Sequence, residues 1–310
     1  MKQAEQDINR VGSKWQDRAT LLFLKLAASG LVPPHWFEKN LPPPGQRAAR
    51  HGHLQLEIVS HCWQYPHFLV YQLSSLVRNP PQQLTVTMTV YYCPDDSGTS
   101  QLLQRFSALD VPGVQWNWQP LPKELLFRRA IGRNRAALAS TADWLWFTDC
   151  DLLFQAGCLD ALAGVLQGRQ EALVFPAVER CTSLLPDENP LLNPDLAASI
   201  PLDIDVSGFT ESKRSRATGP LQITHGDVAR ACGYCNSLAF YQRPAAAWRK
   251  SHEDRAFRWL LQSQGVPLDI PGVYRIRHAS KGRYTGSRFM SRVRGGLRQL
   301  VSRIRESFGA

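Results

Sequence analysis

Two aspartates, Asp149 and Asp151, follow a short apolar run, and this combination restricts the fold more than any other feature of the sequence. The run 144–147 reads Trp-Leu-Trp-Phe and predicts a buried strand. Because ionised aspartates are costly to bury without partners, both should lie at the end of the strand, at the edge of a sheet. Positions two apart share one face of a strand, and hard divalent cations prefer oxygen ligands. The pair therefore predicts a metal site, with a solvated acidic turn as the alternative.

The segments around this pair predict an α/β fold. Residues 84–92 are rich in β-branched and aromatic side chains, which favour a strand, and residues 132–143 are rich in Ala and Leu, which favour a helix. Strand-like and helix-like segments alternate across 53–280, so we expect a mostly parallel, Rossmann-like sheet flanked by helices. Residues 179–222 carry many Pro and Gly without periodicity and are expected to be irregular.

The order of motifs resembles the nucleotide-binding half of GT-A glycosyltransferases, especially family 2. A strand starting near Leu54, an acidic turn at Asp95-Asp96-Ser97 and a helix with Arg133-Asn134 precede the Asp-x-Asp pair, as in that family. A second similarity lies downstream, where Gly233-Tyr234 is followed by Trp248 and then by Glu253-Asp254 at the start of a helix that ends in Gly. The resemblance covers about residues 53–280. It departs from the common pattern at Cys150, inside Asp-x-Asp, and at Arg255, after Glu-Asp.

The resemblance implies a metal-dependent glycosyltransferase that moves a sugar from a nucleotide-diphosphate donor, most often a UDP-sugar, to a hydroxyl acceptor such as a saccharide or a lipid-linked sugar. An inverting reaction needs a carboxylate base, and the departing diphosphate needs a Lewis acid, for which Mn²⁺ or Mg²⁺ suits carboxylate ligands. The implied roles are Asp254, with Glu253 as second candidate, for the base; Asp149, Asp151 and His278 for the metal; Asp95, Asp96, Arg129, Arg133, Asn134 and Asp149 for the donor; and Trp248 for the acceptor side. His225 and Asp227 are assigned to the acceptor side from their position after the irregular segment. Each has a structural alternative: an Asx turn, a helix-capping acid, a solvated arginine face or a structural histidine.

Composition divides the chain into four parts: an N-terminal helical extension with a Pro-rich linker (1–52), a nucleotide-binding half (about 53–178), an acceptor half (about 179–280) and a basic amphipathic helix (281–310). Residues 1–52 hold eight Lys/Arg against four Asp/Glu, and residues 275–310 hold ten against one. The formal net charge is +10, so the remainder, 53–274, carries −3. The positive charge is therefore concentrated at the ends.

Two further function classes are weighed against sugar transfer. A nucleotidyltransferase would need a Gly-rich basic loop after the first strand, whereas residues 60–65 contain no glycine. A nucleic-acid-binding protein would need basic residues interleaved with aromatics on a folded face, so we expect no specific nucleic acid. A lone Cys232-x-x-Cys235 lacks a second ligand pair for zinc, and the odd count of seven cysteines favours free thiols.

The location expected from the sequence is cytoplasmic, because neither a signal peptide nor a membrane-length apolar run is evident. In residues 281–310, apolar residues recur every three or four positions between arginines. Such a helix either binds the anionic inner face of a membrane, making the enzyme peripheral, or packs on the protein.

Overall fold

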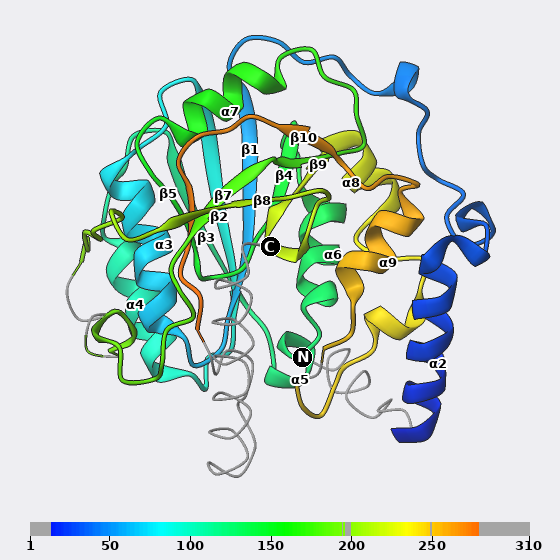
Figure 1. Cartoon of the computed structure of the whole chain (residues 1–310), viewed down its shortest axis with the longest axis horizontal. Coiled ribbons are helices and arrows are strands. Elements are labelled where there is room, and N and C mark those ends of the chain that lie inside the picture. The colour runs from blue at the N-terminus through cyan, green and yellow to red at the C-terminus, as the bar shows by residue number, and fades with distance from the viewer. Residues whose placement is uncertain (1–13, 194, 196–199, 249, 279–310) are drawn as a thin grey trace.

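A seven-stranded sheet forms the centre of the protein (Figure 1), which is seen here in a computed structural model describing residues 14–193, 195, 200–248 and 250–278. Its strand order is β10-β6-β9-β4-β1-β2-β3, and only β9 runs antiparallel to its neighbours. The predicted α/β fold with a mostly parallel sheet is thereby confirmed. The strands are β1 (Leu54–Cys62), β2 (Leu84–Tyr92), β3 (Val114–Pro120), β4 (Trp144–Phe147), β6 (Leu173–Pro176), β9 (Gln222–His225) and β10 (Val266–Leu268).

Helices cover both faces of this sheet. In Figure 1, α3 (Pro66–Arg78) and α4 (Ser97–Ser107) lie on one side, and α6 (Arg129–Ala139), α8 (Gly226–Cys232) and α9 (Glu253–Leu260) lie on the other. Two shorter helices complete this part of the chain, α5 (Lys123–Leu126) and α7 (Cys158–Leu166). Leu56, Ile58, Val86 and Met88 are at most 1% exposed, as the strands of a sheet covered by helices should be.

A second sheet of four short strands, in the order β5-β11-β7-β8, lies against the first. Its strands are β5 (Leu152–Phe154), β7 (Val178–Cys181), β8 (Thr210–Lys213) and β11 (Val273–Arg275). The segment 179–222, expected to be irregular, thus contributes strands, because β7 and β8 pair antiparallel from Val178 with Lys213 to Cys181 with Thr210. Strands of four residues are too short to show a period, which is why the sequence did not reveal them.

The N-terminal part packs on α9. Helix α2 (Lys14–Leu26) continues into a π-helical turn, Ala27–Leu31, within the N-terminal extension expected to be helical. Leu24 and Ala27 are buried in the core, and Trp259 Nε1 donates a hydrogen bond to the carbonyl of Val32 at 2.9 Å. The predicted C-terminal helix, 281–310, lies outside the described residues. In the described part of the chain, no helix combines the length and apolarity needed to cross a bilayer.

Candidate functional site

A cavity of about 460 Å³ opens at the carboxyl ends of β1 and β4. In open α/β sheets this is the edge where ligands bind. The wall contains side chains from the end of β1, the turn before α6, the link from β4 to β5, and the end of β11. The lining residues are His61, Cys62, Trp63, Tyr65, Leu126, Phe127, Arg129, Asp149, Cys150, Asp151, Leu184, Trp248, Lys250, Arg275, Arg277 and His278.

The Asp-x-Asp segment is held by main-chain hydrogen bonds on both sides. Thr148 N donates to the carbonyl of Val59 at 2.9 Å, and Ile276 N donates to the carbonyl of Asp151 at 3.0 Å. Asp149 and Asp151 both line the cavity, and Asp151 is only 4% exposed. The expectation that both carboxylates meet one site at the edge of the sheet therefore matches their position.

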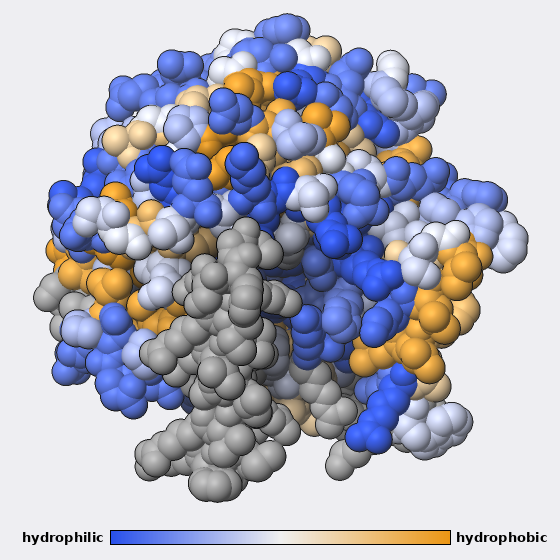
Figure 2. All heavy atoms as spheres, in the orientation of Figure 1, coloured by the Kyte–Doolittle hydropathy of each residue, from blue (hydrophilic) through white to orange (hydrophobic). Residues whose placement is uncertain are grey.

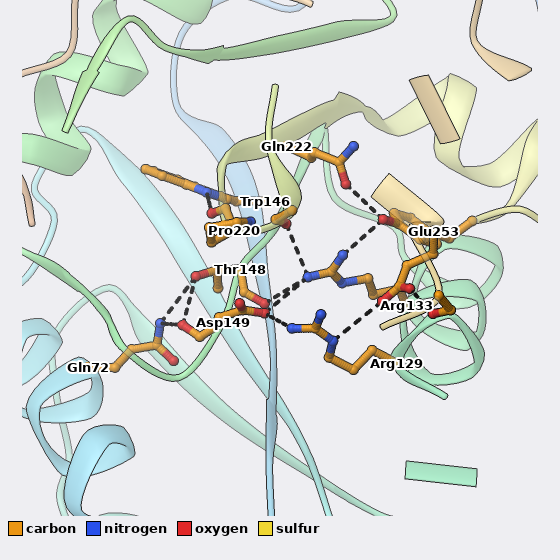
Figure 3. A network of polar contacts seen from close by, with 12 residues as sticks. Gln72, Arg129, Arg133, Trp146, Thr148, Asp149, Pro220, Gln222 and Glu253 are labelled. Carbon is orange, nitrogen blue, oxygen red and sulfur yellow. Dashed lines mark hydrogen bonds and ion pairs between the residues drawn. The ribbon is translucent and has the colours of Figure 1, made fainter. Parts of the chain in front are cut away.

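Two arginines from α6 converge on Asp149 (Figure 3). Arg129 Nη1 lies 2.5 Å from Asp149 Oδ1, and Arg133 Nη2 lies 3.5 Å from the same oxygen. Arg133 is 1% exposed and also donates to the carbonyls of Thr148 and Gly219 at 3.1 Å. The charge of Asp149 is therefore partly balanced by cations before any ligand is present.

The Glu253-Asp254 pair divides between two environments. Glu253 is buried; its carboxylate accepts a hydrogen bond from the Ser251 hydroxyl and lies 3.4 Å from Arg129 Nε (Figure 3). Burial opposes ionisation of Glu253, but the charges of Arg129 and Arg133, together with hydrogen bonds that include the one from Ser251, hold the carboxyl pKa below its ordinary value. Asp254 is about one-third exposed and pairs with Arg258 at 3.2 Å. Neither carboxylate lines the cavity.

A cationic wall opposite these residues comes from the second sheet. Arg275 reaches the cavity from β11, and its Nη2 lies 2.7 Å from Glu179 Oε1. Glu179 is fully buried and is also paired with Arg214. Burial lowers the pKa of Arg275, but the carboxylates of Glu179 and Asp151 more than compensate and raise it. With Arg129, Lys250 and Arg277, four permanent cations line the cavity against two aspartates.

His61, at the end of β1, is a buried lining residue that the sequence did not single out. Its ring stacks on Tyr91 with centroids 5.2 Å apart, and within the described part of the chain neither ring nitrogen has a hydrogen-bond partner. Burial, followed by the charges of Arg133 and Arg129, holds the His61 pKa well below its usual value, so the ring is neutral at pH 7. A Cβ on Gly132 would come within 2.3 Å of His61 Nε2, so α6 can approach β1 only with glycine there.

Three of the predicted donor residues do not line the cavity, and two of them make structural contacts instead. Asp96 caps α4, accepting from Thr99 N at 3.2 Å and from the Thr99 hydroxyl at 2.7 Å, while Asp95 is exposed. Asn134 accepts from Tyr234 N at 2.9 Å and donates to Asn236 at 3.0 Å. Its contacts bind α6 to the segment that follows α8.

The predicted acceptor residues separate in the same way. Trp248 lines the cavity. The predicted metal ligand His278 lines it too, and its Nε2 lies 2.8 Å from Asp187 Oδ1. His225 and Asp227 lie at the opposite edge of the sheet, because β9 runs antiparallel to β4 and pairs His225 with Trp144, the first residue of β4. There His225 Nε2 contacts the carbonyl of Ala48 at 3.1 Å, and Asp227 accepts from Ala48 N at 2.8 Å.

Several lining residues went unnoticed in the sequence. Arg275 and Arg277 flank Ile276 and alternate along an extended segment, a spacing that places them on one face. That signal was available beside His278. Trp63 and Phe127 meet edge to face at 5.7 Å, but they come from distant segments, and no local pattern brings them together.

A metal at this site would depend on more than protein ligands. Within residues 14–193, 195, 200–248 and 250–278, no group of three or more His, Cys, Asp or Glu side chains is close enough to hold an ion. Asp149 and Asp151 offer the hard oxygen donors that Mg²⁺ and Mn²⁺ prefer. Magnesium commonly takes one or two carboxylates and completes its shell with substrate phosphates and water, so a two-carboxylate set fits it.

Comparison with known proteins yields structures only, since no family model and no curated protein matches the sequence. The chain is similar to the mannosyltransferase PcManGT from Pyrobaculum calidifontis, solved with GDP-mannose and Mn²⁺, at 16% identity and a TM-score of 0.43; 95% of this chain and 76% of that chain are covered. It is also similar to S. aureus TarS 1–349, at 11% identity and a TM-score of 0.38, covering 73% and 58% of the two chains. A second TarS structure matches at 10% identity and a TM-score of 0.38, covering 72% and 37%. This chain thus spans 58% of one TarS chain and 37% of the other.

Proposed function

We propose that the protein is a glycosyltransferase that takes a sugar from a nucleoside-diphosphate donor, with a divalent cation, at the cavity between β1, β4 and β11. The observation that carries this proposal is the shared cavity of two carboxylates, Asp149 and Asp151, and four permanent cations. A site of this composition suits a diphosphate that arrives with a metal ion. The resemblance of the motif order to GT-A enzymes of family 2 agrees with it.

The cations are suited to the leaving group. Guanidinium groups match phosphate oxygens in geometry, and Arg129, Arg275 and Arg277 approach the cavity from different walls. Trp63, Tyr65, Phe127 and Trp248 supply aromatic faces on which a nucleobase or a sugar ring can pack.

Mn²⁺ or Mg²⁺, when bound, supplies charge neutralisation for the departing diphosphate. Asp149 and Asp151 would hold it, with His278 as a further candidate in the same cavity. Arg133 and Arg129 fix the orientation of Asp149 through the contacts described above, and main-chain bonds fix Asp151. We infer that these residues keep the carboxylates in position without help from the ligand.

For an inverting transfer we propose Asp254 as the general base. Glu253 is engaged by both Ser251 and Arg129, so we infer that it positions Arg129. Asp254 is the more exposed of the two, and its side chain makes one described ion pair, with Arg258. The UDP donor and a saccharide or lipid-linked acceptor stay proposals from the resemblance. A cytoplasmic location stays a proposal from the sequence.

The test is calorimetric titration of UDP and GDP into the full chain with Mn²⁺, and again with EDTA. We expect nucleotide binding to depend on the metal. Asp151→Asn should weaken nucleotide binding at least about tenfold, because replacing a residue that only positions a metal ligand typically lowers metal affinity by that factor or more. Asp110→Asn is the matched control, because Asp110 is exposed and does not line the cavity. Metal-independent binding of both nucleotides, or equal affinity in the Asp151 variant, would count against the proposal.

A further inference from the structure

Helix α2 carries an apolar stripe on the side that faces solvent. Trp15, Leu22, Phe23 and Leu26 follow helical spacing, and they are between 48% and 70% exposed. Leu31 and Trp36 extend this surface beyond the helix and are 74% and 65% exposed. We call these six residues the α2 surface. Figure 2 shows apolar side chains gathered over α2 at the right of the view.

This concentration is not typical of the rest of the molecule. Among the described residues, one other large apolar side chain is comparably exposed, Leu138 on α6. Isolated exposed leucines are ordinary on soluble proteins, whereas a contiguous apolar patch marks a surface that binds something. The α2 surface is therefore the strongest candidate for an interaction surface in the described part of the chain.

The opposite side of α2 already has its packing partner. Leu24 and Ala27 are buried, Arg255 Nε donates to the carbonyl of Ala28 at 3.3 Å, and the rings of Phe37 and Trp259 lie 5.3 Å apart. The helix is thus fixed on α9 by one face. A helix that is apolar on two faces is normally covered on both, so the outward face lacks its cover.

The charges around the α2 surface indicate what covers it. Arg18, Lys25 and Lys39 are exposed beside it, while Asp17 is partly buried and Glu38 is buried. A twofold contact with a second copy would bring these like charges together, which disfavours it. Exposed cations beside an apolar stripe, with Trp15 and Trp36 at its two ends, are the composition of a helix lying in a membrane interface.

We propose that the α2 surface docks the protein on an anionic lipid bilayer, with the apolar stripe in the interface and Arg18, Lys25 and Lys39 against the headgroups. The docking itself does not depend on the proposed function. Helix α2 packs on α9, which begins at Glu253 beside Arg129, a residue of the cavity wall. An enzyme docked on a bilayer suits a lipid-linked acceptor, and this part of the inference rests on the proposed function.

Cosedimentation of the full chain with vesicles tests the docking. The protein should pellet with phosphatidylglycerol-containing vesicles at low salt, much less with phosphatidylcholine alone, and less as ionic strength rises. Leu22→Gln with Leu26→Gln should lower the partition coefficient at least about tenfold, because each buried leucine typically contributes enough for such a factor. Leu138→Gln is the matched control and should bind like the wild type, and circular dichroism should show all three proteins folded.

Two results would overturn the proposal. One is equal vesicle binding by the double variant, which would place any membrane contact elsewhere in the chain. The other is a wild-type dimer in light scattering that the double variant converts to a monomer while neither binds vesicles, which would assign the surface to self-association. Donor titration is measured separately, so a wild-type protein that binds nucleotide but fails to bind the anionic vesicles would refute the docking alone.

Discussion

Glu179, fully buried in the second sheet, places a carboxylate oxygen 2.7 Å from Nη2 of Arg275, whose side chain reaches the cavity. The buried Glu179 carboxylate thus orients the Arg275 guanidinium, which is exposed to the cavity. The pairing explains how a short strand can hold a flexible side chain at a binding site. It also separates the residue that would touch a phosphate from the residue that positions it.

Replacing Glu179 with Gln should therefore weaken both stability and nucleotide binding. Breaking a buried ion pair typically costs about 3 kcal/mol or more, since it leaves an unbalanced charge on Arg275 and Arg214. Urea unfolding and titration of UDP with Mn²⁺ measure the two effects. Glu211→Gln is the control, because Glu211 pairs with Arg180 on the surface of the same sheet and should matter little. Unchanged nucleotide affinity in a folded Glu179 variant would show that Arg275 does not need this partner.

The two carboxylates at the start of α9 should separate binding from chemistry. Asp254→Asn should leave donor affinity nearly intact and slow transfer about a hundredfold or more, the usual contribution of a general base. Glu253→Gln should instead lower donor affinity, because Arg129 loses the charge that orients it. Donor titration and single-turnover transfer assays distinguish the two. If Asp254→Asn transfers at the wild-type rate, the base lies elsewhere.

Gly132→Ala should destabilise the protein although alanine is the better helix former. In an open helix the change normally gains about 1 kcal/mol, but here the new Cβ would meet His61 Nε2 at 2.3 Å and Tyr91 at 2.9 Å. Gly164→Ala in α7 is the matched control, since a Cβ there meets nothing within 4 Å and should stabilise. Thermal unfolding of both variants checks the contrast, and stabilisation by both would mean that α6 can move away from β1.

Glu57 should make stability depend on pH. Burial raises its carboxyl pKa above the ordinary value, partly offset by hydrogen bonds from Ser140 and Thr89. The folded state therefore holds the proton more tightly than the unfolded chain, whose carboxyl titrates near about 4.3. The stabilisation that the protonated Glu57 carboxyl contributes is complete below that pH. It is lost as the pH rises through the pKa of Glu57 in the folded state.

The free energy of unfolding of Glu57→Gln, relative to that of the wild type, should accordingly be higher at pH 8 than at pH 5. Urea unfolding across this range gives the free energy of unfolding of both proteins, and Glu188→Gln, at an exposed position, should show no such trend. A difference between wild type and Glu57→Gln that is constant with pH would refute the assignment.

The sequence predicted correctly those elements that depend only on neighbouring residues in the chain. The strand expected over 84–92 is β2 with the same bounds, and Asp149 and Asp151 reach one cavity because they follow β4 directly. His225 and Asp227 were assigned from their place after the irregular segment. The antiparallel direction of β9 reverses that inference, and strand direction is set by pairing across the sheet. Arg275 was missed although its alternation with Arg277 was visible, whereas its partner Glu179, which lies 96 residues away, had no local signal.

The position of β9 has a consequence for how the chain is made. β9 lies between β4 and β6, although its residues follow those of β4 by 75 to 81 positions. A ribosome that has just completed β6, at Pro176, has therefore produced two strands whose common neighbour does not yet exist. Until residues 222–225 emerge, Trp144 and Trp146 belong to an open edge, the kind of edge that pairs with other chains. Cutting the gene between the codons for β6 and those for β9 should yield two fragments. Each should aggregate when it is produced alone, and both should be soluble when they are produced together.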